Sequence, residues 1–130
     1  MDSVSSLKFD FKLIRTPRKK SSNIFAYAAS LTIMSNNNVF LYVEDICIID
    51  FIYKLSSYNG TASFSIIPID SSACILVVRR IKDDIVELSS EWTKQIVKVD
   101  FHQFVESIKN LKICFEKTAK ICINEYFDTK

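Results

Sequence analysis

The sequence contains very little glycine, proline and histidine. Its 130 residues include one glycine and two prolines, whereas average usage would be roughly 7% and 5%. Glycine-rich phosphate-binding loops of the G-x-x-x-x-G-K and G-x-G-x-x-G kinds are excluded, because both need several glycines at fixed positions. The same shortage indicates short turns and no long linkers or low-complexity tracts.

His102 is the only histidine, so a Ser-His-Asp or Cys-His mechanism would have to use it. It falls in the first turn of a predicted helix, where the helix dipole disfavours a cationic imidazole. We therefore expect a surface histidine, no catalytic residue and no enzymatic activity. A small enzyme of unfamiliar type is an alternative, and it would depend on His102 or on a carboxylate.

The four cysteines are widely and irregularly spaced, whereas a zinc site usually needs close ligand pairs such as C-x2-C. They are Cys47, Cys74, Cys114 and Cys122. Even Cys114 and Cys122 would lie about two turns apart on one helix. We expect no metal and no cofactor, and we interpret the cysteines as buried free thiols in a reducing compartment.

Secretion and membrane signals are also lacking. The N-terminus has no basic segment followed by an apolar stretch, and no window approaches the roughly 18 uncharged residues of a membrane helix. A cytoplasmic protein without a membrane partner is expected. With 48% hydrophobic residues, the chain has enough apolar surface for one domain spanning residues 1–130.

Period-two alternation over Leu7–Leu13 predicts a first strand with one buried face. A β-compatible stretch over Ile24–Met34 and a return over Val39–Val43 predict a hairpin, since Asn36–Asn38 tolerates positive φ. Four further β-compatible runs predict a meander of antiparallel strands. They are Ala62–Ile69, Ala73–Arg80, Ile85–Leu88 and Gln95–Val99, and Pro68 places the first at a strand end, an edge or a bulge.

Two stretches show helical periodicity. The first, Asp45–Tyr58, has Glu44 and Asp45 where the helix dipole favours negative charge and Gly60 where a left-handed C-cap is wanted. Its predicted buried face comprises Ile48, Phe51, Ile52, Leu55 and Tyr58, while Asp50, Lys54 and Ser57 fall elsewhere.

The second helix starts at a predicted N-cap, Asp100, with Gln103 at the capping-box position. Its apolar stripe continues to Cys122 and Tyr126, which predicts a helix on the order of 40 Å long. Together these elements predict an α+β fold: an antiparallel β-sheet of about six to seven strands, a short helix after the third strand, and a long C-terminal helix packed on the sheet.

Two charged segments are candidate binding sites. The acidic residues Asp83, Asp84, Glu87 and Glu91 lie close in sequence to Trp92, and carboxylates could steer a basic protein partner that the indole anchors. The alternative is a polar turn with a core tryptophan. The basic segment contains Arg15, Arg18, Lys19 and Lys20 and is either a solvated loop or a nucleic-acid contact. The net charge of +2 selects neither.

The run SSEWTKQIVKVDFHQFVESIKNL, together with the order of the elements, resembles immunity proteins of bacterial contact-dependent growth inhibition and related polymorphic toxin systems. In those families a similar strand precedes a helix containing "QF". The local likeness covers about Ser89 to Leu111. The resemblance implies a stoichiometric inhibitor that neutralises a cognate toxin domain, often a nuclease, by occluding its active site. The alternative is a small nucleic-acid-binding or phage-type accessory protein that uses the basic loop at residues 15–20.

Overall fold

The structure is a computed structural model that describes residues 5–60, 63–67 and 75–127. Its α+β fold contains seven antiparallel strands, a short helix after the third strand and a long C-terminal helix, as predicted. The elements are β1 (Leu7–Arg15), η1 (Ile24–Ala26), β2 (Ala28–Ser35), β3 (Asn38–Cys47), α1 (Ile48–Ser56), β4 (Ser63–Ile66), β5 (Leu76–Lys82), β6 (Ile85–Ser90), β7 (Thr93–Asp100), α2 (Phe101–Ala119) and η2 (Ile123–Tyr126).

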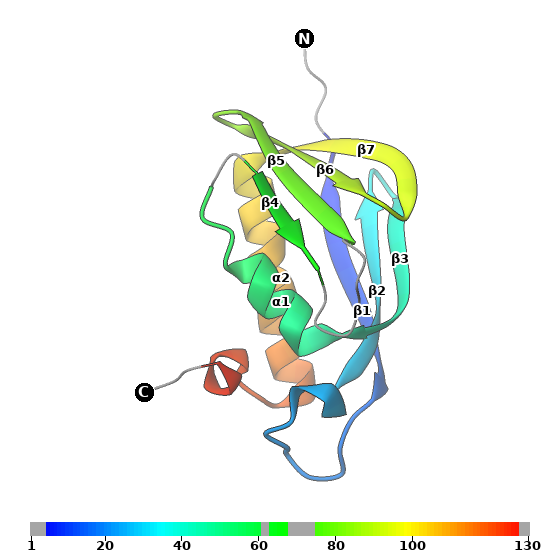
Figure 1. Cartoon of the computed structure of the whole chain (residues 1–130), viewed down its shortest axis with the longest axis vertical. Coiled ribbons are helices and arrows are strands. Elements are labelled where there is room, and N and C mark those ends of the chain that lie inside the picture. Colours follow the sequence, from blue (N-terminus) through cyan, green and yellow to red (C-terminus); the bar gives the residue numbers. More distant parts are fainter. Residues whose placement is uncertain (1–4, 61–62, 68–74, 128–130) are drawn as a thin grey trace.

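The seven strands are divided between two sheets. Strands β1, β2 and β3 form one sheet, and β4 to β7 form the other in sequential order. The sheets meet where β7 contacts β3 and where the Ser5 N–H donates to the Lys98 carbonyl at 2.8 Å. Helices α1 and α2 pack against each other beside the strands (Figure 1). One apolar core therefore lies between both sheets and both helices.

Alternation along β1 determines which of its side chains enter this core. Leu7 and Phe9 are buried, whereas Lys8 and Asp10 are exposed. Helix α2 packs along the same strand. The Phe11 ring of β1 meets the Phe115 ring of α2 edge to face, with 5.6 Å between the ring centroids. The predicted first strand is confirmed, and its buried face also holds the C-terminal helix.

The predicted β2–β3 hairpin is confirmed. Asn36 and Asn37 have φ values of 51° and 68° and link Ser35 to its cross-strand partner Asn38. Asparagine tolerates this left-handed conformation, which a two-residue hairpin turn requires. The start predicted for β2 was wrong, because Ile24–Ala26 forms a 3-10 turn capped by the Asn23 side chain and β2 begins only at Ala28.

The predicted start of the first helix was also wrong. Strand β3 continues to Cys47 because Ile46 and Cys47 are buried and pair with Ala29 and Ala28 of β2. Helix α1 begins at Ile48, so Glu44 and Asp45 are exposed residues of β3.

The other corrections to α1 concern Asp50 and the C-cap. Asp50 is 3% exposed, and its carboxylate forms an ion pair with Lys54, whose Nζ lies 3.0 Å from Oδ2. Gly60 has a positive φ of 87°, as predicted, but the helix ends earlier at Ser56 with a right-handed C-cap at Ser57.

The N-terminus of α2 agrees with its prediction, and its C-terminus does not. The Asp100 side chain accepts a hydrogen bond from the Gln103 N–H at 3.1 Å, as an N-cap should. The helix ends at Ala119, because Lys120 is left-handed and turns the chain so that Ile121 and Ile123 become buried. Its 19 residues span roughly 28 Å instead of 40 Å. Cys122 and Tyr126 therefore lie beyond α2.

Meander strands β4 to β7 are confirmed in order, with bounds shifted by a few residues. Pro68, Cys74 and the ends of the runs predicted at Ala62–Ile69 and Ala73–Arg80 fall outside the described residues.

Candidate interaction surfaces

The acidic residues grouped by sequence are divided between the two ends of β6. Asp83 and Asp84 form the turn between β5 and β6, while Glu91 and Trp92 form the turn between β6 and β7. The six residues of β6 separate the two turns by roughly 20 Å at about 3.3 Å per residue. The predicted acidic cluster is therefore two separate turns with Glu87 between them.

Arg80 fixes the β5–β6 turn against the start of α2. Its Nε donates to the Asp83 carbonyl at 3.1 Å, its Nη2 donates to the same oxygen, and its Nη1 donates to the Gly60 carbonyl at 3.3 Å. The guanidinium lies over the Phe101 ring, 4.2 Å from its centroid. The Arg80 side chain thus binds a main-chain carbonyl of the turn, and the Asp83 and Asp84 side chains remain exposed.

Glu87 is the least accessible of the predicted acidic residues. Its side chain is 18% exposed and lies 3.7 Å from the Arg79 guanidinium. Lys98 is its partner on β7, and Arg79 is its partner on β5. Because two cations flank this carboxylate across the sheet, Glu87 is a weak candidate for a partner contact.

Trp92 is not a core residue, so the alternative of a core tryptophan was wrong. Trp92 is 48% exposed at the tip of the β6–β7 hairpin, where its backbone N–H donates to Ser90 Oγ at 3.0 Å. Ile96, further along β7, is 61% exposed. We call Glu91, Trp92 and Ile96 the hairpin surface. It presents two large apolar side chains and a carboxylate along β7, the edge strand of the four-stranded sheet, and in the turn before it.

Strand β3, which contacts β7, adds exposed residues that sequence reasoning missed. Tyr42 is 54% exposed, and Glu44 and Asp45 are exposed as well. The sequence placed both carboxylates at a helix start and so gave them a structural role. The signal available was the acidic pair directly after the alternating residues of a strand.

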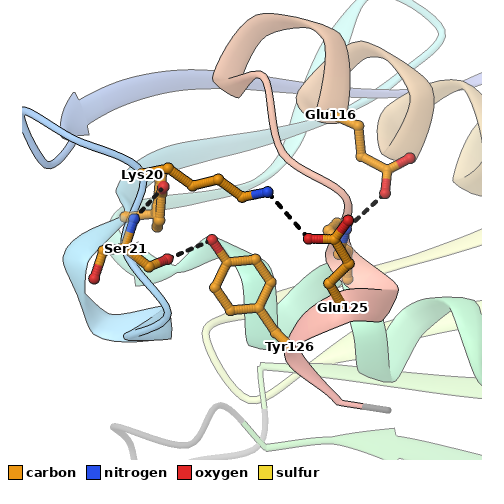
Figure 2. A network of polar contacts seen from close by, with 7 residues as sticks. Lys20, Ser21, Glu116, Glu125 and Tyr126 are labelled. Atoms are coloured by element: carbon orange, nitrogen blue, oxygen red, sulfur yellow. Dashed lines mark hydrogen bonds and ion pairs between the residues drawn. The ribbon is translucent and has the colours of Figure 1, made fainter.

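The basic segment lies at the end of the molecule where β1 finishes. Arg15 is the last residue of β1, and Arg18, Lys19 and Lys20 follow in the exposed loop leading to η1. Lys20 Nζ lies 3.1 Å from the Glu125 carboxylate (Figure 2). This ion pair is exposed on both sides and contributes little to stability, at most about 1 kcal/mol.

A pocket of about 400 Å³ opens between this loop and η2. It is lined by Lys20, Ser21, Ser22, Glu125 and Tyr126. The Tyr126 hydroxyl donates to the Ser21 carbonyl at 2.6 Å (Figure 2), and the Tyr27 ring meets the Tyr126 ring edge to face at 6.3 Å. Burial raises the pKa of Tyr126 above its usual value of 10, and a hydrogen bond with Tyr27 and the nearby Glu125 charge raise it further. The phenol is therefore a stable donor at neutral pH.

Segment η2 also connects this loop to the end of α2. Lys112 Nζ donates to Asn124 Oδ1 at 3.1 Å, and the Ile123 N–H donates to the Glu116 carboxylate at 2.7 Å (Figure 2 shows this second bond). Sequence reasoning missed this arrangement, because it extended α2 through η2.

His102 is exposed, and its ring lies 5.9 Å from the Phe101 ring. Cys47 is buried, but Cys114 and Cys122 are exposed, which corrects their prediction as buried thiols. Over residues 5–60, 63–67 and 75–127, no three histidine, cysteine or acidic side chains gather as metal ligands would. No helix within these same ranges is both long and apolar enough to span a membrane.

Comparison with known families gives a match over most of the chain. A family model described as "Domain of unknown function (DUF7878)" matches residues 4–119. The chain belongs to this family. The DUF7878 match covers every strand and both α-helices and ends at the last residue of α2, so η2 lies beyond it. No curated protein and no solved structure matches the chain.

Proposed function

We propose that this protein is a stoichiometric protein-binding inhibitor, an immunity protein that neutralises a cognate toxin domain by occluding its active site. The observation that carries the proposal is Trp92, which is half exposed on a hairpin tip. Tryptophan is enriched among the residues that dominate protein–protein binding energies. Leaving an indole in water is unfavourable unless a partner covers it.

The surroundings of Trp92 support a basic protein partner. Glu91 precedes it in the same turn, while exposed Glu44 and Asp45 lie further away in sequence, on β3, a strand that contacts β7. A carboxylate beside an apolar anchor speeds the approach of a positively charged partner and selects against acidic ones. Toxin domains that act on nucleic acid have such positive surfaces, because they neutralise phosphates. Local acidity at the hairpin is compatible with the chain's overall charge of +2.

The experiment is a pull-down from the native host at moderate salt with nuclease treatment, followed by mass spectrometry. The captured domain is then purified, its activity is titrated with this protein, and the dissociation constant is measured. We expect complete inhibition at a ratio of one to one. We expect Trp92→Ala to weaken binding by about 30-fold or more, the loss typical of a hot-spot residue. Glu91→Lys should mainly slow association.

Phe25→Ala is the matched control, because Phe25 is an aromatic side chain of similar exposure, 47%, in η1. It should leave the affinity unchanged. A captured toxin domain that binds Trp92→Ala as tightly as wild type would remove the hairpin surface from the proposal. Binding without loss of the toxin's activity would contradict inhibition itself.

A further inference from the structure

We propose that a second surface, at the end of the molecule carrying the basic loop, binds the backbone of single-stranded nucleic acid, with Phe25 as a base-stacking platform. We call this surface the basic end. It comprises Arg15, Arg18, Lys19, Lys20, Phe25, Lys112, Lys117 and Lys120. The proposal is independent of the inhibitor function and of the hairpin surface.

The fold gathers cations that are about a hundred residues apart in sequence. Lys20 contacts Glu125 and Lys112 contacts Asn124, so η2 holds the basic loop against the end of α2. Figure 1 shows the loop after β1, the last turn of α2 and η2 together at one end of the molecule. Seven of the 17 lysines and arginines belong to this surface. The sequence showed only the four within residues 15–20.

Most of these cations have no ion partner within the part of the chain that the structure describes. Over residues 5–60, 63–67 and 75–127, no carboxylate forms an ion pair with Arg18 or Lys19, whereas Lys20 pairs with Glu125. Free exposed cations attract phosphates and release condensed counterions when they bind. This electrostatic term provides most of the affinity of non-specific nucleic-acid binding.

An exposed aromatic side chain next to the cations favours single strands as the ligand. Phe25 is 47% exposed in η1, directly after the basic loop, and the Asn23 side chain fixes this turn by accepting from the Phe25 N–H at 3.0 Å. Unpaired bases stack on such rings whatever their sequence. The pocket beside Lys20 is lined by Ser21 and Ser22, whose hydroxyls can donate to phosphate oxygens.

Glu125 would compete with a phosphate for Lys20, because its carboxylate already forms an ion pair with the Lys20 ammonium at 3.1 Å. Removing that charge should free Lys20 and reduce repulsion of the ligand. Glu125→Gln is therefore expected to tighten nucleic-acid binding several-fold. A purely structural role for the ion pair predicts the reverse, because a loosened loop would bind less well.

The test is the fluorescence anisotropy of a labelled oligothymidylate between about 50 and 200 mM salt. Wild type should bind with a logarithmic salt slope near −0.7 per phosphate contacted. Arg18→Gln and Lys19→Gln should each weaken binding and make the slope shallower by about one contact. Lys94→Gln is the matched control, because it removes the same charge from exposed Lys94 of β7. It should leave both affinity and slope unchanged.

Phe25→Ala should weaken binding about fivefold or more, as expected for loss of a stacked base, while Trp92→Ala should not. Absence of binding at the lowest salt would overturn the proposal. Equal loss with Lys94→Gln would also overturn it, since global charge alone would then explain retention. So would competition by polyglutamate as effective as by unlabelled oligothymidylate, because the basic end would then be a site for acidic proteins.

Discussion

Gly60→Ala is the substitution whose cost the structure defines most closely. Gly60 is the only glycine of the chain, and it has a φ of 87°. An added Cβ would lie 3.0 Å from Arg80 Nη1 and 3.7 Å from the Phe101 ring. The Arg80 guanidinium would have to move, and it is the group that holds the β5–β6 turn.

Three effects determine the free energy of unfolding of this variant. A left-handed conformation costs an L-residue about 1–2 kcal/mol. The Arg80 guanidinium must shift by a few tenths of an ångström, and weakening its contact with the Phe101 ring costs at most about 0.5–1 kcal/mol more. Alanine restricts the unfolded chain and returns roughly 0.5 kcal/mol. The net loss is about 2 kcal/mol, which for a domain of this size lowers Tm by roughly 8 °C.

The energetic coupling between positions 60 and 80 is measured by denaturant unfolding of four proteins: wild type, Gly60→Ala, Arg80→Ala and the double variant. We expect Gly60→Ala to cost about 0.5–1 kcal/mol less in the Arg80→Ala background, because the guanidinium that the new Cβ would contact is then absent. Asn59→Ala, at the exposed neighbouring position, is the control and should stay within about 0.5 kcal/mol of wild type. Equal costs of Gly60→Ala in both backgrounds would refute the contact with Arg80, and a neutral Gly60→Ala would refute the positive φ.

Two further predictions concern α2 and η2. Asp100→Ala should lower the free energy of unfolding by about 1 kcal/mol by removing the cap on the Gln103 N–H, whereas Asp100→Asn should retain most of it in the same denaturant assay. For Tyr126, the pKa is raised in the folded state, so the unfolded chain loses this proton first and stability should fall as pH rises above 10. Tyr126→Phe should be less stable than wild type at neutral pH, because it loses the bond to the Ser21 carbonyl, and should lose less stability between pH 9 and 11. Parallel pH curves for the two proteins would contradict the raised pKa.

Features of the fold that depend on neighbouring residues were predictable from the sequence. The alternation in β1, the asparagine turn between β2 and β3, and the Asp100 cap each depend on a few residues whose side chains determine the local backbone. Division of the strands into two sheets was not predictable, since it depends on how β3 and β7 meet across the core.

The element boundaries were wrong where tertiary burial outweighed local preference. Helix α2 ends at Ala119 with a left-handed lysine, an unusual residue for that conformation, because the turn buries Ile121 and Ile123. Strand β3 continues through Asp45 because Ile46 and Cys47 pair with β2. No nearby residue signals either outcome. Both errors hid surface residues that the candidate sites use.

The net charge of +2 does not say where in the fold the individual charges lie. Asp83 and Asp84 lie in the β5–β6 turn, and Figure 1 shows this turn at the opposite end of the molecule from the loop that carries Arg18 and Lys19. A charge total averages these ends, although a partner approaching one of them is influenced mainly by charges within a Debye length, about 8 Å at physiological salt. An acidic and a basic ligand can therefore be attracted by the same chain at different places. The overall charge therefore does not reveal which ligand binds. Substitutions at each surface do, provided that each is compared with a substitution elsewhere that changes the charge by the same amount.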